Sequence, residues 1–213
     1  MCFSERASIV SFFFGIIGSI LLISLNSINN KIVGYYFIYI SFMQIIDYLL
    51  WRHQICDDYN RMISLLGMFL NHSQPIVLGI LILLFNPIHK NIIVGLMLLY
   101  LCVVIPYSIP FVTNKKLQCT IKGKDNHLLW NWNLMKYKII MYFIYLFVIC
   151  GMFIYGFTNY KIGLISAFVA IITYVSSLFL YSQKYVGTIW CYYSVFIPII
   201  SYLLQYYKFL KKI

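Results

Sequence analysis

Charged side chains are scarce in this sequence, and acidic ones are almost absent. Only 10% of the 213 residues are charged, and only five are Asp or Glu. A soluble domain carries about 25% charged residues. Alanine is nearly missing as well, with three occurrences, although a helical protein has no physical reason to avoid it. The shortage of charge excludes an ordinary soluble domain.

Several runs of roughly 20 residues contain no charge at all. A helix of that length crosses the hydrocarbon core of a bilayer, and in lipid the backbone must satisfy its own hydrogen bonds. The period of two that barrel strands require is absent. We therefore predict an all-α membrane protein, a bundle of seven transmembrane helices. The predicted spans are about 8–28, 32–51, 62–85, 92–112, 137–157, 162–181 and 188–207.

The connections between these spans are short, except for the segment 113–136. No linker or low-complexity segment divides the chain, so we expect residues 1–213 to form a single seven-span membrane domain. The first apolar run, from Ala7 to about Leu25, is longer than the apolar part of a signal peptide and has no small-residue cleavage site. We expect this run to be retained as the first helix.

The formal net charge of +11 reflects lysines and arginines that flank the predicted spans. Ten of them lie on the side of the membrane that holds the N-terminus, here called the N-terminal side, and six on the opposite side. The positive-inside rule therefore predicts a cytosolic N-terminus. Basic side chains near helix ends extend toward the lipid headgroups, so we expect no binding of nucleic acid.

Three polar or aromatic residues share one face of the second span. Gln44 and Asp47 are three residues apart, and Trp51 lies one turn further along the same face. A charged side chain costs about 2.5–3.5 kcal/mol at the centre of a membrane helix and normally faces the bundle interior. We therefore expect this face to line the interior.

The third span carries the sequence Asn-His-Ser-Gln-Pro near its middle. Asn71 and Gln74 are three residues apart, and His72 lies near the mid-membrane. Pro75 removes one backbone donor, which frees a carbonyl in the preceding turn. These features predict either a wet, ligand-lined interior or hydrogen bonds that only join the second and third spans.

The remaining candidates gather on the N-terminal side. His127 and Trp130 lie in the segment 113–136, and Trp190 opens the last span. Together with Trp51, they are expected to surround the opening of a site that faces this side.

Four cysteines map to the same side, and their state depends on the compartment. A disulfide such as Cys2–Cys119 is expected in an oxidising space, and free thiols in the cytosol. The alternatives are a zinc site from two Cys–His pairs, the first with a permissive spacing and the second with a loose one, and a Cys2 nucleophile, which lacks an oxyanion-stabilising neighbour. We expect no catalytic residue, no metal and no cofactor. The zinc ligands would be His53, Cys56, Cys119 and His127.

The order of short motifs along the chain resembles an uncharacterised family of multi-pass membrane proteins that begin Met-Cys-Phe-Ser or Met-Cys-Trp-Ser. The motifs are MCFSERAS, MQIIDYLLW, NHSQPIVL, HLLWNW and GTIWCYYSVFIP. The family is associated with large DNA viruses and has relatives in fungi and algae. The resemblance implies a viral protein of a host or virion membrane, and it implies no activity. It places the family pattern on Cys2, Ser4, Gln44, Asp47, Trp51, Gln74, Pro75, His127, Trp130, Trp190 and Cys191.

The polar residues inside the spans predict a small-solute or proton transporter, or a channel-like protein. Asp47 would be the charged ligand or proton acceptor. The alternatives are a receptor, sensor or assembly factor that binds a partner through 113–136, and an intramembrane enzyme. The expected partners are the lipid bilayer and a small solute or proton. The polar residues expected to line the interior beside Asp47 are Gln44, Asn71, His72 and Gln74.

Overall fold

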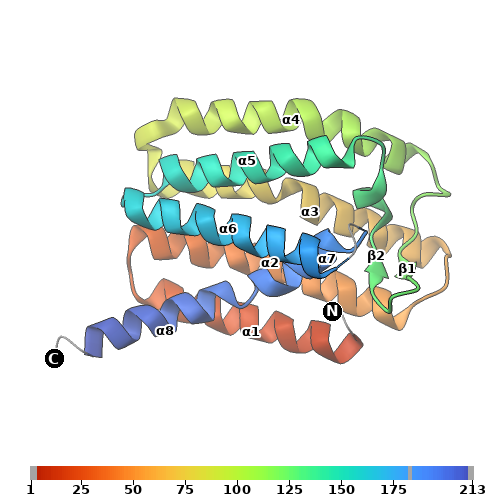
Figure 1. Ribbon diagram of the computed structural model, residues 1–213, viewed down its shortest axis with the longest axis horizontal. Coiled ribbons are helices and arrows are strands. Elements are labelled where there is room, and N and C mark those ends of the chain that lie inside the picture. Colours follow the sequence, from red (N-terminus) through yellow and green to blue (C-terminus); the bar gives the residue numbers. More distant parts are fainter. Residues whose placement is uncertain (1–3, 182–183, 211–213) are drawn as a thin grey trace.

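The charge-free runs form helices in the computed structural model, which describes residues 4–181 and 184–210 (Figure 1). Within these residues, seven helical segments are long and apolar enough to span a membrane. The predicted all-α membrane protein with a seven-helix bundle is therefore confirmed. The helices are α1 (Glu5–Ser24), α2 (Ile28–Arg52), α3 (Asp58–Phe85), α4 (Lys90–Thr113), α5 (Lys138–Gly156), α6 (Tyr160–Leu180), α7 (Val186–Ser194) and α8 (Ile197–Leu210), with a 3-10 turn η1 (Pro87–His89) before α4.

The helix starts follow from capping side chains in the sequence. Ser4 Oγ accepts a hydrogen bond from the Ala7 N–H at 3.1 Å, and Asp57 Oδ1 accepts one from the Asn60 N–H at 3.0 Å. Such bonds satisfy N–H groups that the first helical turn leaves unpaired. The Asn60 bond and a second bond from His53 hold the pKa of Asp57 below its usual value. The helix ends lie within about one turn of the predicted ones.

The last predicted span is interrupted. α7 ends at Ser194 and α8 begins at Ile197. Pro198 has no N–H to donate to the carbonyl of Ser194, and its ring would clash with that carbonyl in a continuous helix. The predicted single helix 188–207 is therefore two helices that together make one candidate span.

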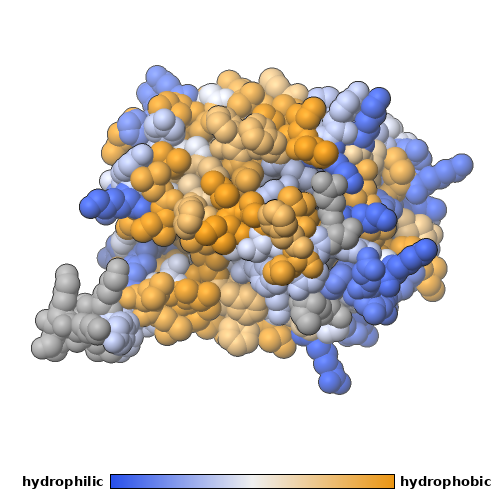
Figure 2. Space-filling view, in the orientation of Figure 1, coloured by the Kyte–Doolittle hydropathy of each residue, from blue (hydrophilic) through white to orange (hydrophobic). Residues whose placement is uncertain are grey.

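Most of the helices pack against two neighbouring helices. α1 packs on α2 and α8, α2 packs also on α3, and α5 packs on α4 and α6. Figure 2 shows apolar side chains over the middle of the molecule and hydrophilic ones toward the two ends of its long axis. The helices run along this axis (Figure 1), so the apolar zone matches the hydrocarbon core and the hydrophilic ends match the two membrane surfaces.

The segment 113–136 is folded and packed on the bundle. It contains the antiparallel strands β1 (Ile121–Lys122) and β2 (Leu128–Leu129) and the 3-10 helix η2 (Asn131–Leu134). Leu128, Trp130 and Trp132 are fully buried among side chains of α2, α3, α4 and α7. Burial of two tryptophans supplies much of the driving force for this docking, because aromatic side chains bury the largest apolar areas.

One glycine marks the closest approach of two helices. A Cβ on Gly163 of α6 would collide with the carbonyl oxygen of Phe153 and lie 3.1 Å from Cα of Ile154, both in the backbone of α5. Gly163→Ala should therefore lower the free energy of unfolding by about 1–3 kcal/mol, because a backbone contact cannot yield as a side chain can.

The measurement is thermal or SDS-induced unfolding in detergent micelles. Gly95→Ala is the matched control, because among the described residues no atom outside the surrounding backbone of α4 lies within 4 Å of the Cβ position at Gly95. That change should leave stability equal or slightly higher, since alanine is the better helix former. Equal stability of the two variants would contradict the close α5–α6 packing.

Candidate functional site

The N-terminal side of the bundle interior is closed. Trp130 Nε1 donates a hydrogen bond to Asp47 Oδ1 at 2.9 Å, and both residues are fully buried. The Trp130 ring stacks on Trp132 with 5.0 Å between the ring centroids. The prediction that Trp130 surrounds an open entrance is wrong, because segment 113–136 carries it into the core. The larger cavity described below extends toward the opposite side of the membrane, and the expected opening toward the N-terminal side stays a prediction.

Covalent and polar contacts hold this segment in place. Cys56 and Cys119 form a disulfide across 63 residues of sequence. The fully buried Asn60 side chain donates to the Thr120 carbonyl and accepts from the Thr120 N–H, both at 2.9 Å. Ser64 Oγ adds a bond to Thr120 Oγ1 at 2.9 Å. The start of α3 therefore serves as the anchor of the segment.

The disulfide differs from the pairing expected from the sequence. Cys119 pairs with Cys56, while Cys2 lies outside the described residues. The same pairing occupies the two sulfurs of the alternative zinc site. No group of three or more His, Cys, Asp or Glu side chains in residues 4–181 and 184–210 could hold a metal ion. His127 instead contacts the rings of Tyr181 and Tyr185, and partial burial lowers the pKa of its imidazole.

The polar residues of α2 and α3 do not form one common site. Asp47 bonds to Trp130, whereas His72 Nδ1 lies 2.8 Å from Ser108 Oγ on α4. Gln44 is fully buried, and neither atom of its amide has a hydrogen-bond partner within the described chain. It lines neither of the two cavities described below. The prediction that all five residues line one interior therefore fails, although all five are buried as expected.

A small polar cavity of about 10 Å³ lies beside His72. Ser108 Oγ donates to the Val104 carbonyl at 2.7 Å, so it accepts from His72 Nδ1–H, and Nε2 of the neutral ring is an acceptor. His72 interacts with the Asn133 side chain and Tyr107 with the Met135 backbone, but neither His72 Nε2 nor Tyr107 Oη has a partner of ordinary hydrogen-bond geometry among the described residues. The volume and polarity suit a single water molecule. The lining residues are Asn71, His72, Tyr107, Asn133, Met141, Tyr142, Tyr145, Gly187 and Trp190.

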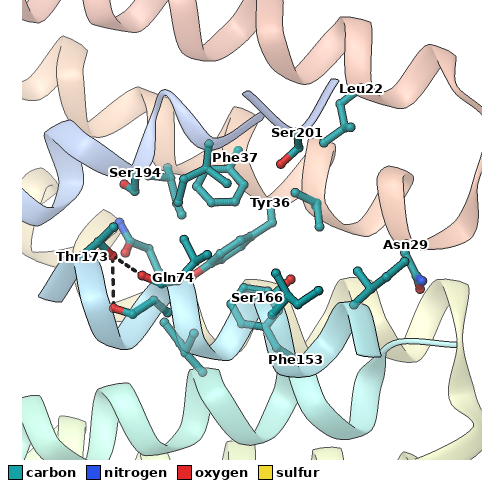
Figure 3. Close-up of a pocket in the computed structure, with 18 of the residues that line it drawn as sticks. Leu22, Asn29, Tyr36, Phe37, Gln74, Phe153, Ser166, Thr173, Ser194 and Ser201 are labelled. Carbon is teal, nitrogen blue, oxygen red and sulfur yellow. Dashed lines mark hydrogen bonds between the residues drawn. The ribbon is translucent and has the colours of Figure 1, made fainter. Parts of the chain in front are cut away.

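A larger cavity of about 140 Å³ lies between α2, α5, α6, α7 and α8, and Leu22 of α1 and Gln74 of α3 also line it. Its inner end is at Gln74 and Thr173, and its other end is at Asn29, toward the side of the membrane opposite the N-terminus (Figure 3). Tyr36 and Phe37 lie between these ends (Figure 3). The two cavities share Tyr145 and Trp190 as wall residues, so they adjoin each other there.

Gln74 is the polar group at the inner end of the larger cavity. Its Oε1 accepts a hydrogen bond from the Tyr145 hydroxyl, and its side chain is 2% exposed. Its Nε2 interacts with the thiol of Cys191, a weak acceptor, and has no partner of ordinary hydrogen-bond geometry in the part of the chain that the structure describes. A buried amide N–H without an acceptor costs about 1–3 kcal/mol, so a ligand oxygen placed there would recover that free energy.

Several of the other polar groups that line the larger cavity have partners among the described residues. Asn30 and Gln205 exchange two hydrogen bonds, of 2.9 and 3.2 Å. Trp190 Nε1 donates to Thr173 Oγ1 at 2.9 Å, which makes Trp190 an interior wall rather than part of an outer opening. Among the described residues that line the cavity, none is charged. An ionised group would therefore be bound there at a large desolvation cost.

Sequence reasoning found Gln74 and Trp190 but missed most of this cavity. Gln205 could have been found, because it is a polar residue inside a predicted span. Asn29 and Asn30 precede the predicted span 32–51, although both are buried in the first turn of α2. Trp51 is half-buried at the end of α2 and lines neither cavity.

Comparison with known proteins gives this chain no relative. No family model matches it, and no curated protein or solved structure was found to match it. The resemblance to membrane proteins that begin Met-Cys-Phe-Ser stays a prediction, and the function must be inferred from the cavities themselves.

Proposed function

We propose that this membrane protein binds a small uncharged solute in the larger cavity and carries it across the membrane. The observation that supports the proposal most directly is a cavity of about 140 Å³ with a buried amide donor at its inner end, Gln74 Nε2, which has no partner of ordinary hydrogen-bond geometry among the described residues. A cavity of about 150 Å³ in a protein core accommodates a molecule as large as benzene. The neutral lining favours an uncharged solute over a proton or an ion.

The closure of one side supports a transporter rather than an open channel. The cavity extends toward the side opposite the N-terminus, while the Trp130–Asp47 contact and segment 113–136 close the other side. Access from one side at a time is the arrangement that alternating access requires. In the alternative role, binding of a partner through 113–136, the two tryptophans of the segment would be unavailable, since both are buried.

The orientation in the membrane has two opposing indicators. Ten basic residues against six favour a cytosolic N-terminal side, whereas the Cys56–Cys119 disulfide favours an oxidising compartment there. We propose the second orientation, because the difference in charge is small. The segment 113–136 would then face away from the cytosol.

The binding role of Gln74 is tested by Gln74→Met, which keeps the length of the side chain and removes its amide. Ligand-induced thermal stabilisation should be recorded with uncharged oxygen-bearing solutes such as glycerol, erythritol and short alcohols, and with amines and carboxylates of similar size. We expect the uncharged solutes alone to stabilise the wild type. In Gln74→Met their affinity should fall about tenfold, the effect of one lost hydrogen bond to a buried donor.

Gln44→Met is the matched control, because Gln44 is equally buried but lies outside the cavity. It should bind solute as the wild type does. Uptake of radiolabelled glycerol or erythritol into proteoliposomes should be equal for the wild type and Gln44→Met and lower for Gln74→Met. Equal binding by the wild type and Gln74→Met, or stabilisation by charged solutes only, would overturn the proposal.

A further inference from the structure

The opening of the larger cavity lies between two membrane-spanning helices. Its outer wall is formed by Ile162 and Ile165 of α6 and by Ser201 and Gln205 of α8. α6 packs on α5 and α7, whereas α8 packs on α1, and the two helices diverge toward the end of the chain (Figure 1). The exposed side chains of Ile162, Ile165 and Gln205 show that the wall reaches the protein surface here.

The surface around this opening is apolar. Phe168 on α6 and Leu203 and Leu204 on α8 are each more than half exposed. Ile165 lies five residues after the start of α6, which is about 8 Å along the helix axis. Gln205 lies at a similar distance from the end of α8. The opening therefore faces lipid close to the boundary between headgroups and acyl chains.

The lining of the cavity has two chemically different parts. Its walls are mostly aromatic and aliphatic, with Tyr36, Phe37, Ile149 and Phe153 among them. The amide donor Gln74 Nε2, which has no partner of ordinary hydrogen-bond geometry among the described residues, lies at the inner end. A molecule that fits both parts has an apolar body and one oxygen that accepts a hydrogen bond, and it has no charge.

We propose that the solute is an uncharged amphipathic molecule dissolved in the bilayer, such as a medium-chain alcohol or ketone, which enters between α6 and α8. Its oxygen accepts a hydrogen bond from Gln74 Nε2, and its apolar body lies along Tyr36 and Phe153. The inference rests on the proposed function in one respect, because it uses the same cavity. It adds the chemical class of the solute and its route from the membrane.

The test uses a diazirine derivative of octanol as a photoaffinity probe, with the full-length protein in lipid nanodiscs. Crosslinked residues are mapped by mass spectrometry. We expect labelling of cavity-lining residues of α2, α5 and α6, reduced by excess unlabelled octanol. In Gln74→Met the affinity of the competing octanol should fall about tenfold, the effect of one lost hydrogen bond.

The route is tested by filling the opening. Ser201 is half-buried in the outer wall, so Ser201→Phe should reduce labelling inside the cavity severalfold without touching Gln74. Leu204→Phe is the control, because Leu204 lies on the same helix and is 60% exposed. It should leave labelling unchanged. Equal labelling in Ser201→Phe and the wild type would overturn the route between α6 and α8.

The remaining outcomes separate this inference from the function on which it rests. If glycerol stabilises the wild type but the octanol probe labels only lipid-facing residues, the cavity takes its solute from water. The amphipathic class is then wrong and the proposed binding site stands. If neither glycerol nor the octanol probe binds in the cavity, both proposals fall.

Discussion

Replacing Trp130 with alanine should lower the free energy of unfolding by about 3–5 kcal/mol, the largest effect expected for any single change in this protein. The side chain is fully buried, stacks on Trp132 and donates to Asp47. Its loss would leave a cavity and would also take one donor from a buried carboxylate. SDS-induced unfolding in mixed micelles measures the difference.

Two further variants help to separate the cost of the cavity from the cost of the lost hydrogen bond. Trp130→Phe keeps one aromatic ring and removes the N–H together with the rest of the indole, so it should cost less than Trp130→Ala, about 1–3 kcal/mol. Phe179→Ala removes an aromatic side chain that is 83% exposed, and should change stability by less than about 0.5 kcal/mol in detergent. If Trp130→Ala were no more harmful than Phe179→Ala, segment 113–136 could not be docked in the bundle as described.

The disulfide should give the second-largest effect. Cys119→Ser, or full reduction, should lower stability by about 2–4 kcal/mol, because the bond closes a long loop in the unfolded chain. Cys56 and Cys119 are 63 residues apart, and the disulfide joins the α2–α3 connection to the segment 113–136. Thermal unfolding with and without reductant measures the difference.

Cys102→Ser is the matched control, because Cys102 is an exposed free cysteine in α4. It should change neither the stability nor its response to reductant. The redox state of Cys56 and Cys119 in membranes whose thiols are alkylated at harvest also tests the orientation. A formed disulfide agrees with an N-terminal side outside the cytosol. Free thiols would instead support the cytosolic N-terminus that the distribution of basic residues predicts.

The helices could be predicted from the sequence because their determinants are local. A charge-free run of about 20 residues has one stable conformation in lipid, whatever its neighbours are. The determinant of the break between α7 and α8 is also local, because the break follows from Pro198. The prediction nevertheless treats 188–207 as one continuous helix. The burial of Asp47, Asn71, His72 and Gln74 follows from the cost of polar groups in hydrocarbon.

The partners of those buried residues could not be predicted. Asp47 and His72 both face inward, but one bonds to a tryptophan in a connecting segment and the other to a serine on α4. Which residues meet depends on helix rotation and on pairing across more than 30 positions of sequence. Helical periodicity alone carries no information about either.

The sequence by itself determined that this chain is a seven-span helical membrane protein with polar groups in its interior. Hydropathy and helix length act within each segment, so they can be evaluated without the rest of the fold. Only the tertiary structure decided that segment 113–136 closes the N-terminal side and that the cavity lies at the other. Both depend on long-range packing, in which Trp130 meets Asp47 and Asn30 meets Gln205. No local pattern specifies such contacts, because many arrangements of the same helices would bury the same polar faces.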